Sequence, residues 1–204
     1  KVLKNKTNNI LAVCVLIVAN ETLANGFALN EQSASAAGTA YAGRSSSALD
    51  ASTIFGNPAG LAKLKRPEVS GGLAVLFARD DISSVQTGAS GTSKGDSVPV
   101  TAVPFGYFSS PIDDSWSAGV GIYVPFGLIN DYENNFQGRY HGSYSKISVI
   151  TIQPTIAYRI NEKISIGGGP TINRLSGKLD NYLATGALNG GNETEVSLKG
   201  DDTA

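Results

Sequence analysis

The chain has 204 residues, with 16 Lys and Arg against 17 Asp and Glu, and its formal net charge is −1. Charged residues make up only 16% of the sequence, where a soluble domain has about 25%. The near-neutral charge excludes a protein that binds nucleic acid through a basic surface. A single Cys and a single His exclude a disulfide framework and a zinc site built from these residues.

Residues 1–24 have the pattern of a secretory signal peptide. Three lysines within the first six residues precede the apolar run ILAVCVLIVA, and small residues follow before Ala24. Such a run is too short for a membrane helix, which needs about 20 apolar residues, so we predict cleavage after Ala24. A short buried helix is the alternative interpretation. The sequence contains no Met, and we therefore expect the start of the reading frame to be missing.

Residues 25–61 are too rich in Gly, Ala and Ser to predict an ordinary core. This stretch precedes the first predicted strand and ends near the tight sequence Asn57-Pro58-Ala59. Its small residues suit a compact, irregular plug.

Later segments alternate between apolar and polar residues, which is the period of a β-strand with one face in an apolar environment. The alternation is clearest from Ile150 to Ile160, where Ile150, Ile152 and Ile156 oppose Thr151 and Thr155. A sixth strand begins shortly before the chain stops at LKGDDTA. The five predicted strands are Val69–Phe77, Val98–Phe108, Trp116–Val124, Ile150–Ile160 and Ile164–Asn173.

Long and short connections alternate strictly between these strands. Ala78–Ser97 and Pro125–Tyr144 are long, whereas Ser110–Ser115 and Asn161–Lys163 are short turns. Outer-membrane barrels have long extracellular loops, short periplasmic turns and strands that are apolar outside and polar inside. We therefore predict an all-β fold, a transmembrane antiparallel β-barrel, with a secreted β-sandwich as the alternative. Five strands cannot close a barrel without leaving backbone groups unpaired in lipid, so further C-terminal strands are expected.

The stretches NGFALNE, GTAYAGRSSSALDASTIFGNPAGL and GRYHGSYSKI resemble the FadL/TodX family of outer-membrane transporters for long-chain fatty acids and aromatic hydrocarbons. The resemblance runs from about Asn25 to Leu179. It implies a barrel of 14 strands whose lumen is closed by an N-terminal hatch. The implied organisation is a signal peptide at 1–24, a hatch at 25–66 and the first five to six barrel strands at 67–204.

The resemblance also implies a route for the substrate. It is captured outside, passes a pocket touched by the N-terminus, and leaves sideways through a gap where the third strand breaks beside the hatch. The matching ligand-contacting residues are Phe27 and Leu29, although Phe27 could instead anchor the hatch. The matching gate residues are Asn57, Pro58 and Ala59 in the hatch and Pro125 and Gly127 in the strand.

Residue chemistry supports the break independently. Pro125 has no N–H to give the ladder, and Gly127 can bend where other residues cannot. The alternative is that Pro125 ends the strand and starts a loop.

Apolar residues in the long segment after the third strand are candidates for substrate capture, namely Phe126, Leu128, Ile129 and Phe136. Arg174 and Lys178 could hold a carboxylate headgroup, but their parity is that of the lipid face, which fits lipopolysaccharide equally well. Asn181 stands where the family has an arginine that helps to hold the headgroup. The choice between fatty acid and aromatic hydrocarbon therefore stays open.

Catalytic chemistry is not predicted. His141 has no third orienting group for a Ser–His pair, and GASGT at 88–92 misses the nucleophile-elbow pattern. We expect a passive, monomeric channel with no cofactor and no metal, whose partners are hydrophobic molecules, outer-membrane lipid and lipopolysaccharide. The alternative function is a structural or adhesive barrel whose hatch only seals the lumen.

Overall fold

The computed structural model describes residues 27–80, 82–93, 96–184 and 192–204. The predicted signal peptide lies outside the described residues. Within them, no helix is long and apolar enough to cross a membrane. The elements are α2 (Ala34–Ala37), α3 (Thr53–Gly56), the 3-10 helix η1 (Pro58–Lys63), β1 (Glu68–Leu76), β2 (Thr101–Pro111), β3 (Trp116–Asp131), β4 (Tyr144–Arg159), β5 (Ser165–Gly168), β6 (Ile172–Ala184) and β7 (Glu193–Thr203).

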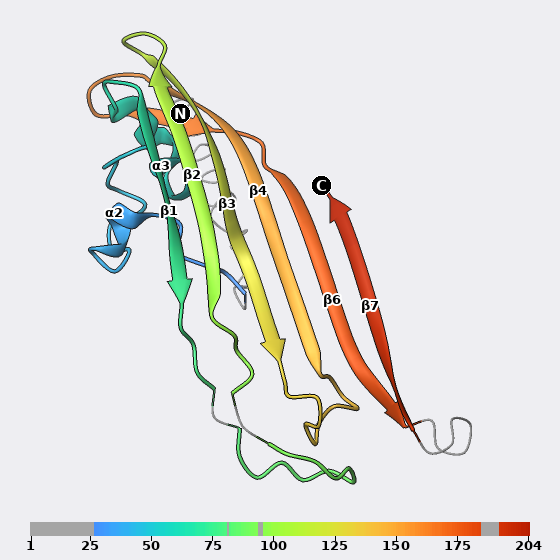
Figure 1. Cartoon of the computed structure of the whole chain (residues 1–204). Helices are drawn as coiled ribbons and strands as arrows, with labels where there is room; N and C mark the ends of the chain where they lie inside the picture. Colours follow the sequence, from blue (N-terminus) through green and yellow to red (C-terminus); the bar gives the residue numbers. More distant parts are fainter. Residues whose placement is uncertain (1–26, 81, 94–95, 185–191) are drawn as a thin grey trace, which may run out of the picture.

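The strands form one antiparallel sheet in the order β1-β2-β3-β4-β6-β7, and β5 pairs with the end of β4 that lies beyond β6, near the short turns. Figure 1 shows a single curved layer, with the long connections at one end and the short turns at the other. The small helices lie against one face of the sheet, near the short-turn end. The antiparallel order and the alternation of connection lengths confirm the all-β prediction.

Several predicted strand boundaries were wrong: β2 is shifted by three residues from the prediction, β4 begins at Tyr144 and not at Ile150, and β6 continues to Ala184. β3 does not end before Pro125 but continues to Asp131, so the loop that follows it is shorter than expected. The predicted strand Ile164–Asn173 is interrupted between β5 and β6, where Pro170 cannot donate to the ladder. A Cβ on the neighbouring Gly169 would lie 1.8 Å from the carbonyl oxygen of Pro154, so only glycine fits there.

The predicted alternation of the strands separates two faces of the sheet. On β4, Thr151, Thr155 and Ala157 are buried on the face that carries the hatch, whereas Ile150 and Ile156 are exposed on the other face. The exposed large apolar side chains of β1 and β3 near the short-turn end follow the same pattern. This apolar outer surface is what a bilayer covers in a β-barrel.

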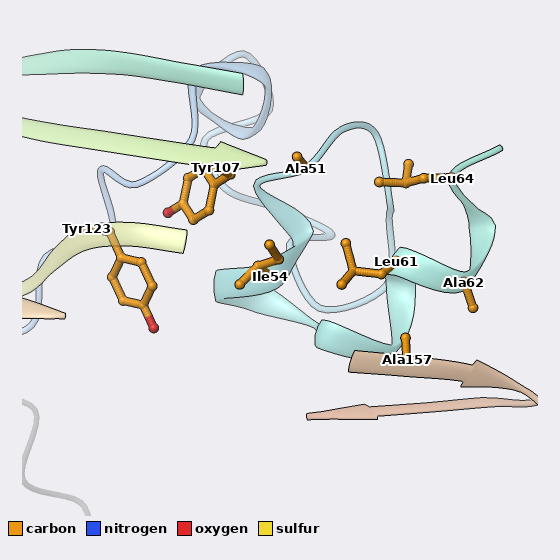
Figure 2. Close-up of a cluster of buried hydrophobic side chains, with 8 residues drawn as sticks. All are labelled: Ala51, Ile54, Leu61, Ala62, Leu64, Tyr107, Tyr123 and Ala157. Carbon is orange, nitrogen blue, oxygen red and sulfur yellow. The ribbon is translucent and has the colours of Figure 1, made fainter. Parts of the chain in front are cut away.

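The hatch seats on the sheet through a small apolar core, which Figure 2 shows between the hatch helices and the strands. Ile54 and Leu61 are fully buried there. They approach the wall at Gly119, where a Cβ would lie only 2.8 Å from Cδ1 of Ile54. Each such side chain contributes roughly 1.5–3 kcal/mol through its burial. The core consists of Ala51, Ile54, Leu61, Ala62, Leu64, Tyr107, Tyr123 and Ala157.

The full-length protein is expected to fractionate with the outer membrane and to run as a heat-modifiable monomer on a gel. A closed barrel has all of its backbone groups paired and stays compact in detergent until it is boiled. The measurement is gel mobility before and after boiling. A soluble periplasmic protein whose mobility does not change on boiling would contradict the barrel.

Candidate functional site

The ladder between β2 and β3 ends halfway along both strands. Paired residues run from Pro111 with Ser117 to Gly106 with Ile122. Beyond that point, Thr101–Phe105 of β2 pairs only with β1, and β3 pairs only with β4 among the strands. We call this unpaired region of the wall the β2–β3 gap.

A β-bulge lies in β3 at the start of this gap. Tyr123 pairs with Thr151 and Phe126 pairs with Val149, so two residues of β3 stand opposite the single residue Ile150 of β4. The predicted break at Pro125 is therefore a bulge inside a continuous strand. The extra residue also exchanges the two faces of β3, because side chains alternate with a period of two.

The N-terminal end of the described hatch covers the edge of β3 that β2 leaves. The N–H of Leu29 donates to the carbonyl of Pro125 at 2.8 Å, and the N–H of Gly127 donates to the carbonyl of Phe27 at 3.0 Å. Leu29 fills the space beside Gly127, where a Cβ would lie 3.1 Å from its Cδ1. Phe27 is half exposed. The structure thus brings together four of the predicted site residues, Phe27, Leu29, Pro125 and Gly127.

Gln32 joins the same arrangement, and sequence reasoning missed it. Its side chain is fully buried, its Nε2 donates to the carbonyl of Val124 at 2.6 Å, and its Oε1 accepts from the N–H of Val124 at 3.3 Å. The hydroxyl of Tyr107 donates to its backbone carbonyl at 2.9 Å. These partners are distant in sequence, so no local pattern around Gln32 indicates them.

The predicted placement of Asn57-Pro58-Ala59 beside the break was wrong. Ser165 of β5 donates its hydroxyl to the carbonyl of Ala59 at 3.1 Å, and a Cβ on the adjacent strand residue Gly167 would lie 2.7 Å from the nitrogen of Ala59. Gly167 pairs with Ala157, which pairs with Ser117 of β3. That level is about 25 Å along β3 from Pro125, at about 3.3 Å per residue. The physical reason is that Ile54 and Leu61 fix this corner at the short-turn end.

One charged side chain of the hatch, Asp50, has hydrogen-bond partners in both the hatch and the sheet. Burial disfavours the charged form of Asp50, but hydrogen bonds from Ser52, Ser35 and Ser70 outweigh it and lower the pKa of Asp50 below its usual value. Ser70 belongs to β1, so this carboxylate ties the hatch to the wall. Among the described residues, no group of three His, Cys, Asp or Glu side chains could hold a metal ion.

A cavity of about 720 Å³ lies at the long-loop end of the sheet, and its lining includes Tyr132, Phe136, Leu179, Val196 and Leu198. Leu179 pairs with Leu198 and with Ser145, so it shares the inward face of the sheet. Among the predicted capture residues, Phe136 lines this cavity. Phe126 and Leu128 face inward on the short-turn side of the cavity, because they pair with Val149 and Ile147. Ile129 faces outward.

Arg139 holds the loops around this cavity together. Its guanidinium forms an ion pair with Glu193 at the start of β7 and donates to the carbonyl of Ser90 at 2.9 Å. Hydrogen bonds to Glu193 raise the pKa of Arg139 above its usual value, and they outweigh the burial of the side chain, which acts in the opposite direction. Arg139 therefore links the connection after β1, the connection after β3 and the start of β7 at the long-loop end of the sheet.

Residues 15–204 match the family described as outer membrane protein transport protein (OMPP1/FadL/TodX). The chain belongs to this family. It is 32% identical over 187 residues to the long-chain fatty acid transport protein of Escherichia coli K12, an alignment that covers 87% of this chain and 42% of that protein. It is 31% identical over 182 residues to outer membrane protein P1 of Haemophilus influenzae Rd, covering 82% and 40% of the two chains.

The fold also resembles that of a solved FadL homologue from Pseudomonas aeruginosa. The TM-score is 0.68 at 22% identity, over 88% of this chain and 47% of that structure. The chain thus spans about two fifths of the length of the relatives named above. Family membership confirms the resemblance deduced from the hatch motifs, the β-barrel fold class and the outer-membrane location.

Replacing Gly167 with Val is expected to loosen the hatch. The added Cβ would lie 2.7 Å from the nitrogen of Ala59 and 2.8 Å from the carbonyl carbon of Pro58, and these backbone atoms cannot turn aside. Overpacking of this kind costs about 1–3 kcal/mol, so the conductance of the purified full-length protein in planar bilayers should rise. Gly168→Val is the control, because no atom lies within 4 Å of its Cβ position. Equal conductance of both variants would contradict this close contact between the hatch and β5.

Proposed function

We propose that the full-length protein is a passive outer-membrane transporter for hydrophobic molecules, which leave its lumen sideways through the β2–β3 gap. The observation that carries this proposal is the early end of the β2–β3 ladder. Beyond it, the edge of β3 is covered by the short segment Phe27–Leu29 of the hatch and not by the neighbouring strand. A segment held by two backbone hydrogen bonds can be displaced without unfolding the wall.

The distribution of apolar residues supports capture at the long-loop end. On β4, the inward residues toward the short turns are mostly polar, such as Thr151, whereas Val149 and Ile147 toward the long loops are apolar. On β6, Leu175 and Leu179 continue this inward apolar surface, because they pair with Val149 and Ser145. The cavity lies at the end of that surface nearest the long loops. An apolar molecule bound there gains about 25 cal/mol for each Å² removed from water.

The same distribution supports a sideways exit. Outward apolar residues predominate in the halves of β3 and β4 near the short turns, and inward apolar residues predominate in the halves near the long loops. The two surfaces meet at the level of Phe126 and Val149, which is the level of the bulge. An apolar molecule that left there would enter lipid without crossing the polar part of the lumen near the short turns. Avoiding water saves about 0.8 kcal/mol for each CH₂ group.

The names of the relatives support the class of substrate. The relative from Escherichia coli K12 is a long-chain fatty acid transport protein. In this chain the cavity contains Asn181, a neutral side chain, beside Leu179. We propose long-chain fatty acids or aromatic hydrocarbons as substrates, moved by partition alone and without a covalent step.

We also propose contact with lipopolysaccharide on the outer surface. Arg174 pairs with the outward residue Ile150, and Lys178 pairs with Lys146 and Lys199, so these cations share the outward face. Lys178 also forms an ion pair with Asp180, which neutralises part of this charge. Like charges directly opposite one another on a sheet repel, and phosphate groups would relieve the repulsion that remains.

Replacing Gly127 with Val is expected to abolish uptake of hydrophobic substrate while leaving binding intact. The side chain would compete with Leu29 for the space beside the bulge, since Cδ1 of Leu29 already lies 3.1 Å from the Cβ position. Uptake is measured in cells that depend on the substrate, and binding is measured on the purified barrel. Gly106→Val on β2 is the control, because it has open space at its Cβ position. Wild-type uptake in a correctly inserted Gly127→Val protein would contradict the sideways exit and favour a route straight through a displaced hatch.

Replacing Phe27 with Ala should weaken binding of a hydrophobic ligand by about 1–3 kcal/mol, which is the value of most of a buried aromatic contact. The barrel should persist because the N–H of Gly127 donates to the backbone carbonyl of Phe27, which the substitution leaves in place. A ligand titration of the folded protein measures the change. Unchanged affinity would assign Phe27 a sealing role.

A further inference from the structure

The bulge leaves the backbone of Val124 without a partner in the sheet. Neither its N–H nor its C=O lies in the register that β3 forms with β2 or β4. In a membrane wall, an unpaired backbone group is costly because no water replaces the missing strand. A bulge at this position therefore requires another donor and another acceptor close by.

One buried side chain supplies both. The carboxamide of Gln32 donates to the carbonyl of Val124 at 2.6 Å and accepts from its N–H at 3.3 Å, as a peptide group of a neighbouring strand would. An amide can do this because it carries a donor and an acceptor on one planar group. No charged side chain could replace it, since a carboxylate lacks the donor and an ammonium lacks the acceptor.

The backbone of Gln32 is held by the other strand. Its carbonyl accepts the hydroxyl of Tyr107, which belongs to β2 and pairs there with Gly121 of β3. Tyr107 thus lies one residue before the last pair of the β2–β3 ladder. Gln32 therefore connects β2 to β3 at the point where the two strands separate, and its side chain is fully buried between them.

We infer that Gln32 is a positioning residue that sets the geometry of the β2–β3 gap. It satisfies the bulge in β3 while its backbone is fixed to β2, so the strands are held at the spacing of one hatch residue and cannot pair directly. This inference deepens the proposed sideways exit and rests on it for its functional meaning. The geometric part can be tested separately.

The test replaces Gln32 with Leu, which has a similar size but no hydrogen-bonding group. Spin labels at Ala102→Cys on β2 and Ile129→Cys on β3 report the distance across the gap in the full-length protein. Gln153→Leu is the matched control, because Gln153 is also a buried glutamine facing the lumen, but its amide accepts from the side chain of Tyr123 and not from Val124. Heat-modifiable mobility identifies folded protein.

The expected result is a shifted or broadened distance distribution in Gln32→Leu and the wild-type distribution in Gln153→Leu. Uptake should fall toward the background of cells without the protein, while the affinity for a hydrophobic ligand stays near that of the wild type. An unchanged distance in folded Gln32→Leu would overturn the inference. A changed distance with wild-type uptake would support the positioning role and overturn the sideways exit.

A second measurement needs no substitution at Gln32. Hydrogen exchange of the wild-type protein should show a protected amide at Val124, although this residue has no partner in the ladder. Rapid exchange at Val124, beside slow exchange at Ile122, would also overturn the inference.

Discussion

The structure depends on one constraint: inside a membrane, each backbone N–H and C=O must find a partner within the protein. Ladders satisfy this constraint along most of the sheet, and the β2–β3 gap is the exception. There the hatch takes over, with Phe27 and Leu29 on the edge of β3 and the amide of Gln32 on Val124. At this point hatch residues take the place of a neighbouring strand. The hatch and the β2–β3 gap are therefore one structural unit.

The composition of the hatch follows from where it has to fit. A plug inside a barrel must approach the wall closely over a large area, and bulky side chains on both surfaces would hold the two apart. Here the large residues are few and face glycines, as with Ile54 against Gly119, while Ala59 meets Gly167 across backbone atoms. A stretch that looks too small to form a core thus shares a core with the sheet.

Much of the fold could be predicted from the sequence because its signals are local. The two-residue period of Ile150–Ile160 predicted both a strand and its outward face, and Pro125 with Gly127 marked the position of the bulge. The continuation of β3 to Asp131 could not be predicted, because a proline looks like the end of a strand unless a bulge releases it from the ladder. The partners of Gln32 lie 75 and 92 residues away, so its role leaves no mark in the local pattern.

The bulge also explains how the apolar residues of the sheet change from its outer face to its inner face along the strands. On β4 the apolar residues change from the outer to the inner face between Ile150 and Val149, through a change in the sequence pattern alone. On β3 the extra residue at the bulge makes the corresponding exchange, because it moves Phe126 to the inner face beside Val149. Both strands thus change sides at one level. The inner apolar surface that begins at the long-loop end reaches this level beside the β2–β3 gap, where the apolar outer surface begins. The single residue inserted at the bulge therefore brings the two apolar surfaces together at the gap.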